Sequence, residues 1–321
     1  MLSKWIGVAL GLVLSSVATG VLAQQYPDRA VKIIVPFAAG GFTDTLARIV
    51  GQKLGEKWGQ PVVIENKPGA GGNIGAELAA KAAPDGYTLF VACTPTHGVN
   101  PALYGKLNFD PVKDFEPVVL MVATPNVIVA NNALPVKNVQ ELISLAKREP
   151  TLINYASTGV GSSVHLQMEQ FKAATGVSMA HIPYKGSAPA LTDLIGGRVQ
   201  VMFDNFPFQL PHIKAGKVKP LAITATKRAT QLPEVPILRE GGIEGFDMGP
   251  WFGLVAPART PAAIVARVNA DVNEILRMSE VQQKIEGAEV LGGTPQQFAA
   301  FIGQEIDKWS KLIRALDLKA N

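Results

Sequence analysis

Five loops rich in glycine, serine and threonine hold the residues whose types and spacing could bind a small molecule. They lie at 38–43, 94–97, 157–163, 185–187 and 204–207. At a helix start, free backbone N–H groups and the positive end of the helix dipole bind carboxylates or phosphates, and hydroxyl groups add donors. Each loop taken singly is better explained as an ordinary turn or cap. Five of them on one predicted edge favour an anion site.

The candidate ligand-binding residues come from these loops and their immediate neighbours. They are Gly40, Gly41, Phe42, Thr43, Asp44, Thr94, Thr96, His97, Thr158, Gly161, Ser162, Ser163, His165, Tyr184, Lys185, Gly186, Asp204 and Asn205. Small residues let backbone N–H groups approach a ligand closely, and no loop contains an arginine that would form a charged clamp. We therefore expect the helix starts at 41–43, 161–163 and 186–187 to hold a carboxylate.

Four of these candidates have a second interpretation. Lys185, the only cation in the five loops, is either an anchor for the anion or a solvated turn lysine. Asp44 lies in the first turn of a helix, where a carboxylate stabilises the helix dipole. Asp204 could hold a water or a ligand amine, or tie a loop. Phe42 could face the ligand, which would favour an aromatic or longer apolar acid, or fold away from it.

Catalysis is the weaker interpretation of the same residues. The sequence lacks a G-x-S-x-G motif, and one helical turn between Ser162 and His165 does not aim a base at a nucleophile. The four histidines, at 97, 165, 181 and 212, lack metal-site spacing, and residues 69–75 do not match G-x-G-x-x-G. We expect no catalytic residue, no metal and no cofactor. An exported α/β hydrolase or isomerase acting on a carboxylate stays the alternative.

The segments that would position the loops alternate between strand and helix. Strands are predicted at 31–35, 62–64, 87–92, 153–157, 180–184, 199–205 and 221–225. Gly59 is the expected stop of the first helix. Helices near the C-terminus should begin at Thr260-Pro261, at Ser279 with Gln282 and at Thr294-Pro295 with Gln297, and the last two pairs match the capping box. This order predicts an α/β fold of mostly parallel sheets flanked by helices.

Two sets of apolar runs indicate that the chain forms two lobes. The runs 118–123 and 126–130 leave the first α/β set, and 251–256 returns to it. We expect one lobe from residues 24–122 and 247–321, with residues 123–246 inserted as the second. A ligand would lie between the lobes, at the carboxyl ends of the strands.

Composition excludes several classes of protein. Of 321 residues, 47% are hydrophobic, which suffices for a packed core and excludes a disordered chain. The net charge is +4, but lysine and arginine are scattered, so a nucleic-acid partner is not indicated. The single cysteine, Cys93, excludes an intrachain disulfide and a multi-cysteine zinc site. Its position after an apolar run predicts a buried thiol.

The N-terminus has the pattern of a secretory signal peptide. Lys4 supplies the positive charge, an uncharged apolar run extends from Trp5 to Leu14, and Val21-Leu22-Ala23 precedes a cleavage site. We expect residues 1–23 to be removed, and the mature chain to be a soluble, monomeric protein of the bacterial periplasm. An uncleaved anchor helix is the alternative.

The same loops carry a resemblance to a known family. The chain resembles the Bug receptors, the extracytoplasmic substrate-binding proteins of tripartite tricarboxylate transporters. The matching segments appear in the family's order across the mature chain. They are Pro36–Gly41 with Asp44, Glu65–Gly75 running on to Pro84–Thr88, His181–Gly186, Phe203–Asn205 and Trp251–Pro257.

This resemblance implies a two-lobed Venus-flytrap receptor of the type II periplasmic-binding-protein class. Such receptors capture small carboxylates. They present them to the permease subunits of a membrane carrier, although a sensor is an alternative partner. Dicarboxylates, tricarboxylates, acidic amino acids and aromatic acids all satisfy the loops of this chain, so each stays open as the ligand. Family members are similar in holding carboxylates with backbone amides, hydroxyls and ordered water.

Overall fold

The computed structural model describes residues 26–246 and 249–315. The expected signal peptide and its cleavage after Ala23 lie outside these residues. Within them, no helix combines the length and the apolar character needed to cross a membrane.

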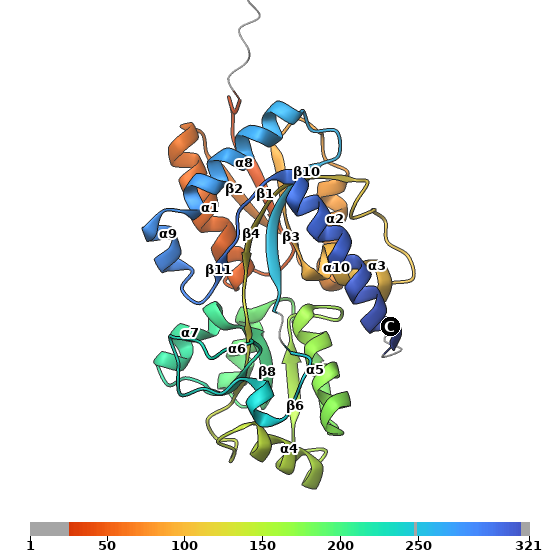
Figure 1. The fold of residues 1–321 in the computed structure, drawn as a ribbon, viewed down its shortest axis with the longest axis vertical. Coiled ribbons are helices and arrows are strands. Elements are labelled where there is room, and N and C mark those ends of the chain that lie inside the picture. The colour runs from red at the N-terminus through yellow and green to blue at the C-terminus, as the bar shows by residue number, and fades with distance from the viewer. Residues whose placement is uncertain (1–25, 247–248, 316–321) are drawn as a thin grey trace, which may run out of the picture.

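Two lobes, one above the other in Figure 1, are each built on a separate β-sheet. Within the described residues, the first-lobe sheet contains, from edge to edge, β11 (Glu289–Val290), β4 (Phe115–Ala123), β10 (Trp251–Pro257), β3 (Thr88–Cys93), β1 (Val31–Val35) and β2 (Val62–Asn66). The second-lobe sheet contains β7 (Ala180–Pro183), β6 (Asn154–Ser157), β8 (Val201–Asn205), β5 (Asn126–Ala130) and β9 (Lys219–Ile223). Both ends of the described chain therefore belong to the first lobe.

Helices cover both faces of each sheet. In the first lobe, α1 (Phe42–Trp58), α8 (Ala262–Leu276) and α9 (Ser279–Lys284) pack on one face, and α2 (Asn73–Ala80) and α10 (Pro295–Ala315) on the other. In the second lobe, α4 (Val139–Arg148) and α5 (Ser163–Thr175) cover one face, and α6 (Ser187–Ile195) and α7 (Phe206–Lys214) the other. The remaining helical segments are η1 (Ala70–Gly72), η2 (Pro95–Val99), α3 (Asn100–Leu103) and η3 (Leu238–Gly241).

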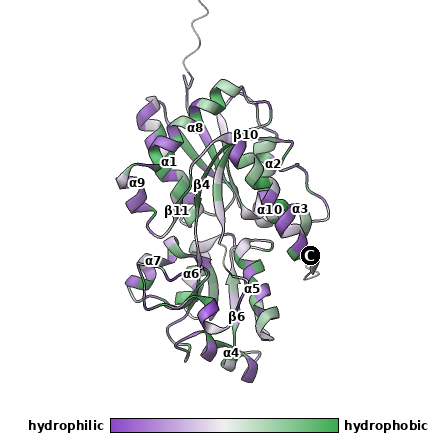
Figure 2. Ribbon diagram, in the orientation of Figure 1, coloured by the Kyte–Doolittle hydropathy of each residue, from purple (hydrophilic) through white to green (hydrophobic). Residues whose placement is uncertain are grey.

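Alternation along β1 explains why its sheet is covered on both faces. Val31, Ile33 and Val35 pack in the core with α1 and α8, whereas Ile34 packs in the core with α2 and α10. Successive side chains of a strand point to opposite faces, so a strand that carries buried apolar residues on both faces needs a layer on each side. Figure 2 shows these apolar strands between helices that turn polar residues outwards.

The α/β architecture is as expected, but the sheets are mixed rather than mostly parallel. β1 pairs in parallel with β2 and β3, and β6 does so with β7 and β8. β10 and β5 instead run antiparallel to both of their neighbours. The reason is topological, because β4, β5 and β10 flank the crossings between the lobes.

Of the four expected helix ends, those at Gly59 and Thr294 follow their sequence signals. α8 begins at Ala262, one residue later than expected, because Pro261 is its cap and not its first helical residue. α1 stops at Gly59, whose φ of 67° is left-handed and whose N–H donates to the Gly55 carbonyl. Thr294 and Gln297 exchange both bonds of a capping box at the start of α10. The capping box expected from Ser279 is wrong. α9 is capped by the extended residue Met278, and Ser279 is already helical.

The chain crosses between the lobes at two segments that touch each other. The Thr124 N–H donates to the Pro250 carbonyl over 2.9 Å. A Cβ atom on Gly249 would lie 1.6 Å from the Thr124 carbonyl oxygen, so only glycine fits there. We retain the division into residues 24–122 with 247–321 and residues 123–246 as a proposal, with the joint at these two segments.

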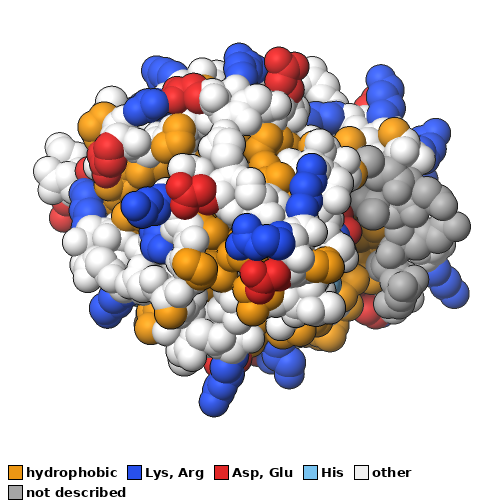
Figure 3. All heavy atoms as spheres, turned by 90° about the horizontal axis from the view of Figure 1, so that it is seen from below, with side chains coloured by type: hydrophobic (Ala, Val, Ile, Leu, Met, Phe, Trp, Pro, Cys, Tyr) orange, Lys and Arg blue, Asp and Glu red, His pale blue; other side chains and the backbone are white. Residues whose placement is uncertain are grey.

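The burial of Cys93 and the mixed charges on the surface agree with what the composition predicted. Cys93 is fully buried, and burial raises the pKa of its thiol to about 11. Figure 3 views the molecule from the end of the second lobe. There, lysine and arginine side chains lie among acidic and hydrophobic ones without forming a block of one sign.

Candidate ligand-binding site

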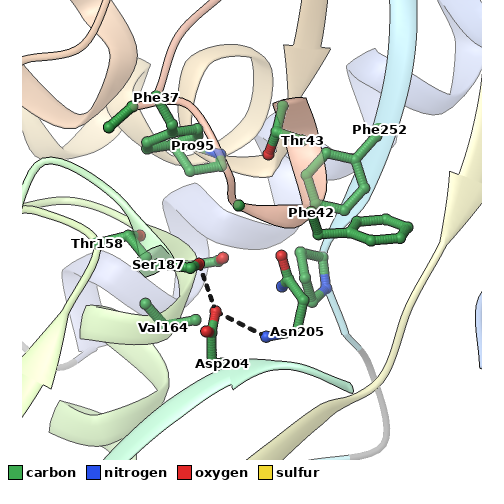
Figure 4. A pocket seen from close by; sticks show the side chains of 14 residues that line it. Phe37, Phe42, Thr43, Pro95, Thr158, Val164, Ser187, Asp204, Asn205 and Phe252 are labelled. Carbon is green, nitrogen blue, oxygen red and sulfur yellow. Dashed lines mark hydrogen bonds between the residues drawn. The ribbon is translucent and has the colours of Figure 1, made fainter. Parts of the chain in front are cut away.

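A small cavity lies between the lobes, where loops from both sheets meet (Figure 4). Its volume of about 30 Å³ leaves room for little more than ordered water. Its lining residues are Phe37, Ala38, Gly41, Phe42, Thr43, Pro95, Thr158, Ser163, Val164, Ser187, Asp204, Asn205, Pro250 and Phe252. The lobes are thus closed around a narrow space in this structure.

Seven of the candidate residues line this cavity. They are Gly41, Phe42, Thr43, Thr158, Ser163, Asp204 and Asn205. Phe42 was expected either to face the ligand or to fold onto its lobe, and it does both. It faces the cavity and also packs edge-on against Phe252, with ring centroids 5.3 Å apart. The role of the seven residues in binding stays a prediction, but the structure brings them together from three of the five loops.

Seven further lining residues were not among the candidates. Ser187 belongs to the expected loop 185–187, and its position at a helix start was the signal for it. Phe37, Pro95, Pro250 and Phe252 are apolar walls, which a search for anion-binding side chains passes over.

Helix starts from both lobes surround the cavity. α1 begins at Phe42 after Gly41, and α6 begins at Ser187 after Gly186, in both cases without a side-chain cap. α5 begins at Ser163 and α7 at Phe206, next to Asn205. The first N–H groups of a helix lack intrahelical acceptors. The cavity therefore receives the positive ends of four dipoles.

Asp204 is a fully buried carboxyl group on the floor of this cavity. Its Oδ1 accepts from the Ser187 hydroxyl at 2.8 Å and from the Asn205 N–H at 2.9 Å, and its Oδ2 accepts from Gln209 Nε2 at 2.8 Å. Burial raises the pKa of Asp204 to about 6, and these three hydrogen bonds oppose that rise. Asp204 thus does tie loops together, and it does so inside the cavity.

Asp44 and Thr94 have structural roles outside the cavity. Asp44 accepts from the Gly40 N–H, Arg48 and Asn66, so it closes the turn before α1. The pKa of Asp44 is lowered, because these bonds and the Arg48 charge outweigh its partial burial. The Thr94 hydroxyl accepts from the Trp251 N–H.

The π-helical turn η2 explains the position of Thr96 and His97. Thr96 bonds back to Cys93 and to His97 Nδ1 at 2.9 Å. The His97 ring is fully buried beside Phe90 and Phe115, and burial lowers the pKa of His97 to about 3. The wide turn thus directs both side chains into the lobe and leaves Pro95 at the cavity.

Ser162, Gly161 and His165 support the loop beside Thr158. The Ser162 hydroxyl accepts from the His165 N–H, which makes Ser162 the cap of α5. His165 Nδ1 accepts from the Gly161 N–H, and the His165 ring stacks on His181 with centroids 4.2 Å apart. These three residues support the loop and do not line the cavity.

The remaining candidates lie at the rim. Tyr184 donates its hydroxyl to Asp193 within the second lobe. The Lys185 side chain is exposed, and its contribution is the main-chain carbonyl. Gly186 is buried against Ala38, and a Cβ on Gly40 would lie 3.3 Å from Ala188. Gly40 and Gly186 therefore permit close approach of the lobes.

Two hydrogen bonds join the first lobe to loops of the second. The Ala38 N–H donates to the Lys185 carbonyl over 2.9 Å. The Tyr104 hydroxyl donates to the Val160 carbonyl over 3.1 Å. These bonds can exist only when the lobes are closed.

A serine–histidine pair that the sequence patterns did not predict bears on the enzyme alternative. Ser157 Oγ lies 2.6 Å from His181 Nε2, a distance suited to a nucleophile and its base. Ser157 is fully buried, however, and its hydroxyl also contacts the Gly159 main chain. Neither residue lines the cavity. This pair therefore braces the loop at 157–161.

Comparison with known proteins places the chain among transport receptors. Residues 46–318 match the model of the tripartite tricarboxylate transporter family receptor. Protein BugT of Bordetella pertussis is 36% identical over 315 residues, which cover 97% of each chain.

Two solved structures with bound ligands are similar to this chain. R. palustris Rpa4515 with adipate is 39% identical, has a TM-score of 0.88, and is matched over 92% of this chain and 99% of its own. MatC (Rpa3494) from Rhodopseudomonas palustris with bound malate is 38% identical, has a TM-score of 0.86, and is matched over 90% of this chain and 100% of its own. The expected two-lobed class of fold is confirmed by this similarity.

Proposed function

This chain belongs to the tripartite tricarboxylate transporter receptor family, and we propose that it binds a small carboxylate between its lobes without altering it chemically. The observation that carries the proposal is the convergence of helix starts from both lobes on one cavity. Each start offers about half a unit charge, so two or three balance one carboxylate.

Similar receptors support a carboxylate as the ligand. Two structures that resemble this chain over nine-tenths of its length hold adipate and malate. The hydroxyl groups of Thr43, Thr158 and Ser163 line the cavity of this chain and form no side-chain hydrogen bond within the described residues. They are therefore available as donors to a carboxylate.

The proposed site of action is the periplasm. The family consists of receptors of a membrane carrier, and the N-terminal pattern predicts export with cleavage after Ala23. On this proposal the monomeric, closed, loaded protein delivers its ligand to the permease subunits of a tripartite carrier. N-terminal sequencing of the exported protein should begin at Gln24, and a mature form that retains Trp5 would contradict the expected cleavage.

One experiment separates a receptor from an enzyme. Freshly purified protein is examined by native mass spectrometry, then stripped of ligand and incubated with a pool of small carboxylates. A receptor retains one acid at one equivalent, and NMR of the pool shows every acid unchanged. Steady conversion of an acid would establish the hydrolase or isomerase alternative. Absence of binding to any carboxylate would refute the proposal.

A further inference from the structure

We propose that the cavity selects carboxylic acids that carry a hydrogen-bond donor, a hydroxyl or an ammonium group, close to the carboxylate, and that Asp204 receives that donor. This inference rests on the proposed function and narrows the class of ligand. Its basis is an asymmetry between the walls of the cavity, which are named here the donor wall (Thr43, Thr158 and Ser163) and the acceptor wall (Ser187 and Asp204).

The donor wall is suited to the ligand's carboxylate. Its three hydroxyl groups have no side-chain hydrogen bond within the described residues, so their protons are available. Thr43 lies in the first turn of α1, and Ser163 is the first residue of α5. The dipoles of both helices add to the attraction for an anion.

The acceptor wall cannot serve the same purpose. A serine hydroxyl has one proton, and that of Ser187 is donated to Asp204 Oδ1, so Ser187 offers the cavity only lone pairs. Asp204 already occupies the position of an anion beside the start of α7, because it accepts from the Asn205 N–H. A second carboxylate here would meet a like charge.

Asp204 keeps an acceptor position open. A carboxylate has about four lone-pair sites, and the described neighbours Ser187, Asn205 and Gln209 fill three of them. Among residues 26–246 and 249–315, Oδ2 accepts only from Gln209. Asp204 is also the only ionisable side chain among the described residues that line the cavity. A ligand with a hydrogen-bond donor fills the remaining acceptor position of Asp204. A ligand without a donor leaves the buried carboxylate with one hydrogen bond unmade.

Matched acids test this selection in the wild-type protein. Calorimetry at pH 7.5 compares three series of acids, and the three members of each series differ only at carbon 2. The first series is succinate, malate and aspartate. The second is adipate, 2-hydroxyadipate and 2-aminoadipate, and the third is 3-phenylpropanoate, phenyllactate and phenylalanine. In the series whose length fits, we expect a substituted acid to bind about 10–150-fold more tightly than its parent, which is the effect of one hydrogen bond to a charged group. The second and third acids of each series distinguish a hydroxyl from an ammonium group.

Two variants assign the selection to Asp204. In Asp204→Asn the carbonyl oxygen should stay with Ser187 and the Asn205 N–H, which places an amide donor where Oδ2 stood. The preference for substituted acids should then fall below about threefold. Thr43→Val, on the donor wall, should weaken all three acids of the series and leave their ratio unchanged. A melting curve verifies that each variant is folded.

The outcomes separate this inference from the proposed function. Parent acids that bind as tightly as substituted ones would overturn the inference and leave carboxylate binding intact. An unchanged preference in folded Asp204→Asn would also overturn it. If no acid of any series bound, the proposed function and the inference would fail together.

Discussion

Asp204 is buried completely, and no ion pair to it forms among the described residues. The pKa of this carboxyl is raised from 3.8 to about 6 because burial disfavours the charged form. A raised pKa means that the folded state binds its proton more tightly than the unfolded state does. Asp204 therefore costs stability at neutral pH, and this cost disappears as the pH falls from about 6 to below 4.

The variant Asp204→Asn should accordingly stabilise the ligand-free protein at pH 7.5. The shift of about two pKa units corresponds to at most about 3 kcal/mol in the free energy of unfolding, and we expect about 1–3 kcal/mol. Gln209 Oε1 is buried and has no partner in the described part of the chain. Inverting the Gln209 amide therefore breaks no bond of this oxygen and lets it accept from the new Asn side chain. Urea unfolding at pH 7.5 and pH 4 measures the effect. An equal effect at both pH values would contradict this explanation.

A substitution at Lys185 tests whether the lysine ammonium group or the helix starts hold the ligand's carboxylate. Its side chain is exposed, and its carbonyl, which any residue supplies, makes the contact with Ala38. Lys185→Met should therefore weaken ligand binding by less than tenfold, or about 1.4 kcal/mol. Calorimetry at low and high salt is the measurement. A hundredfold loss in the folded variant would make Lys185 the anchor.

At the scale of elements, two adjacent residues at the start of α5 have different roles, one in the stability of the protein and the other in ligand binding. Ser162 caps the helix, whereas Ser163 lines the cavity. Ser162→Ala should lower the free energy of unfolding by about 0.5–2 kcal/mol. Ser163→Ala should weaken ligand binding by about 10–150-fold, the loss of a hydrogen bond to a charged group. Each variant is the control for the other in calorimetry and urea unfolding, and the opposite assignment of effects would refute the role given to Ser163.

The strands and the helix ends at Gly59 and Thr294 were predictable because their signals are local. β1 occupies the predicted range 31–35, and Gly59 ends α1 through its own backbone conformation. Thr294 and Gln297 lie close enough in sequence to bond each other wherever the helix packs. The mixed sheets were not predictable from such signals, because the direction of β10 depends on where the chain returns between lobes.

The site was predictable at the level of loops and less so at the level of side chains. Composition identified the loops that hold Thr43, Thr158 and Asp204. The direction of each side chain depends on the local turn. One wide turn is enough to bury Thr96 and His97 and to expose Pro95 to the cavity. Sequence spacing alone does not distinguish these outcomes.

At the scale of the whole molecule, the closed arrangement depends on contacts that opening would break. The Tyr104 hydroxyl bonds the Val160 carbonyl across the lobes. Tyr104→Phe removes this bond from the closed state only. Ligand affinity should fall about 2–13-fold, the effect of a net contribution of about 0.5–1.5 kcal/mol. Calorimetry measures the loss, and X-ray scattering measures the extension of the ligand-free molecule.

A matched control is available within the first lobe. The Tyr87 hydroxyl donates to Asp28, and both residues belong to the same lobe. Tyr87→Phe should therefore leave ligand affinity within twofold. Equal losses in Tyr104→Phe and Tyr87→Phe would show that the bond between the lobes has no special part in closure.

The burial of the Cys93 thiol has a consequence for labelling this protein with dyes. It is the only cysteine of the chain, it is fully buried, and its raised pKa keeps it protonated at neutral pH. Thiol-reactive dyes attack thiolates that they can reach, so the natural protein should resist maleimide. A dye attached through Lys185→Cys would then sit alone at the rim beside Ala38. Its emission would report each closure of the lobes, which would make the protein an optical sensor for its own ligand.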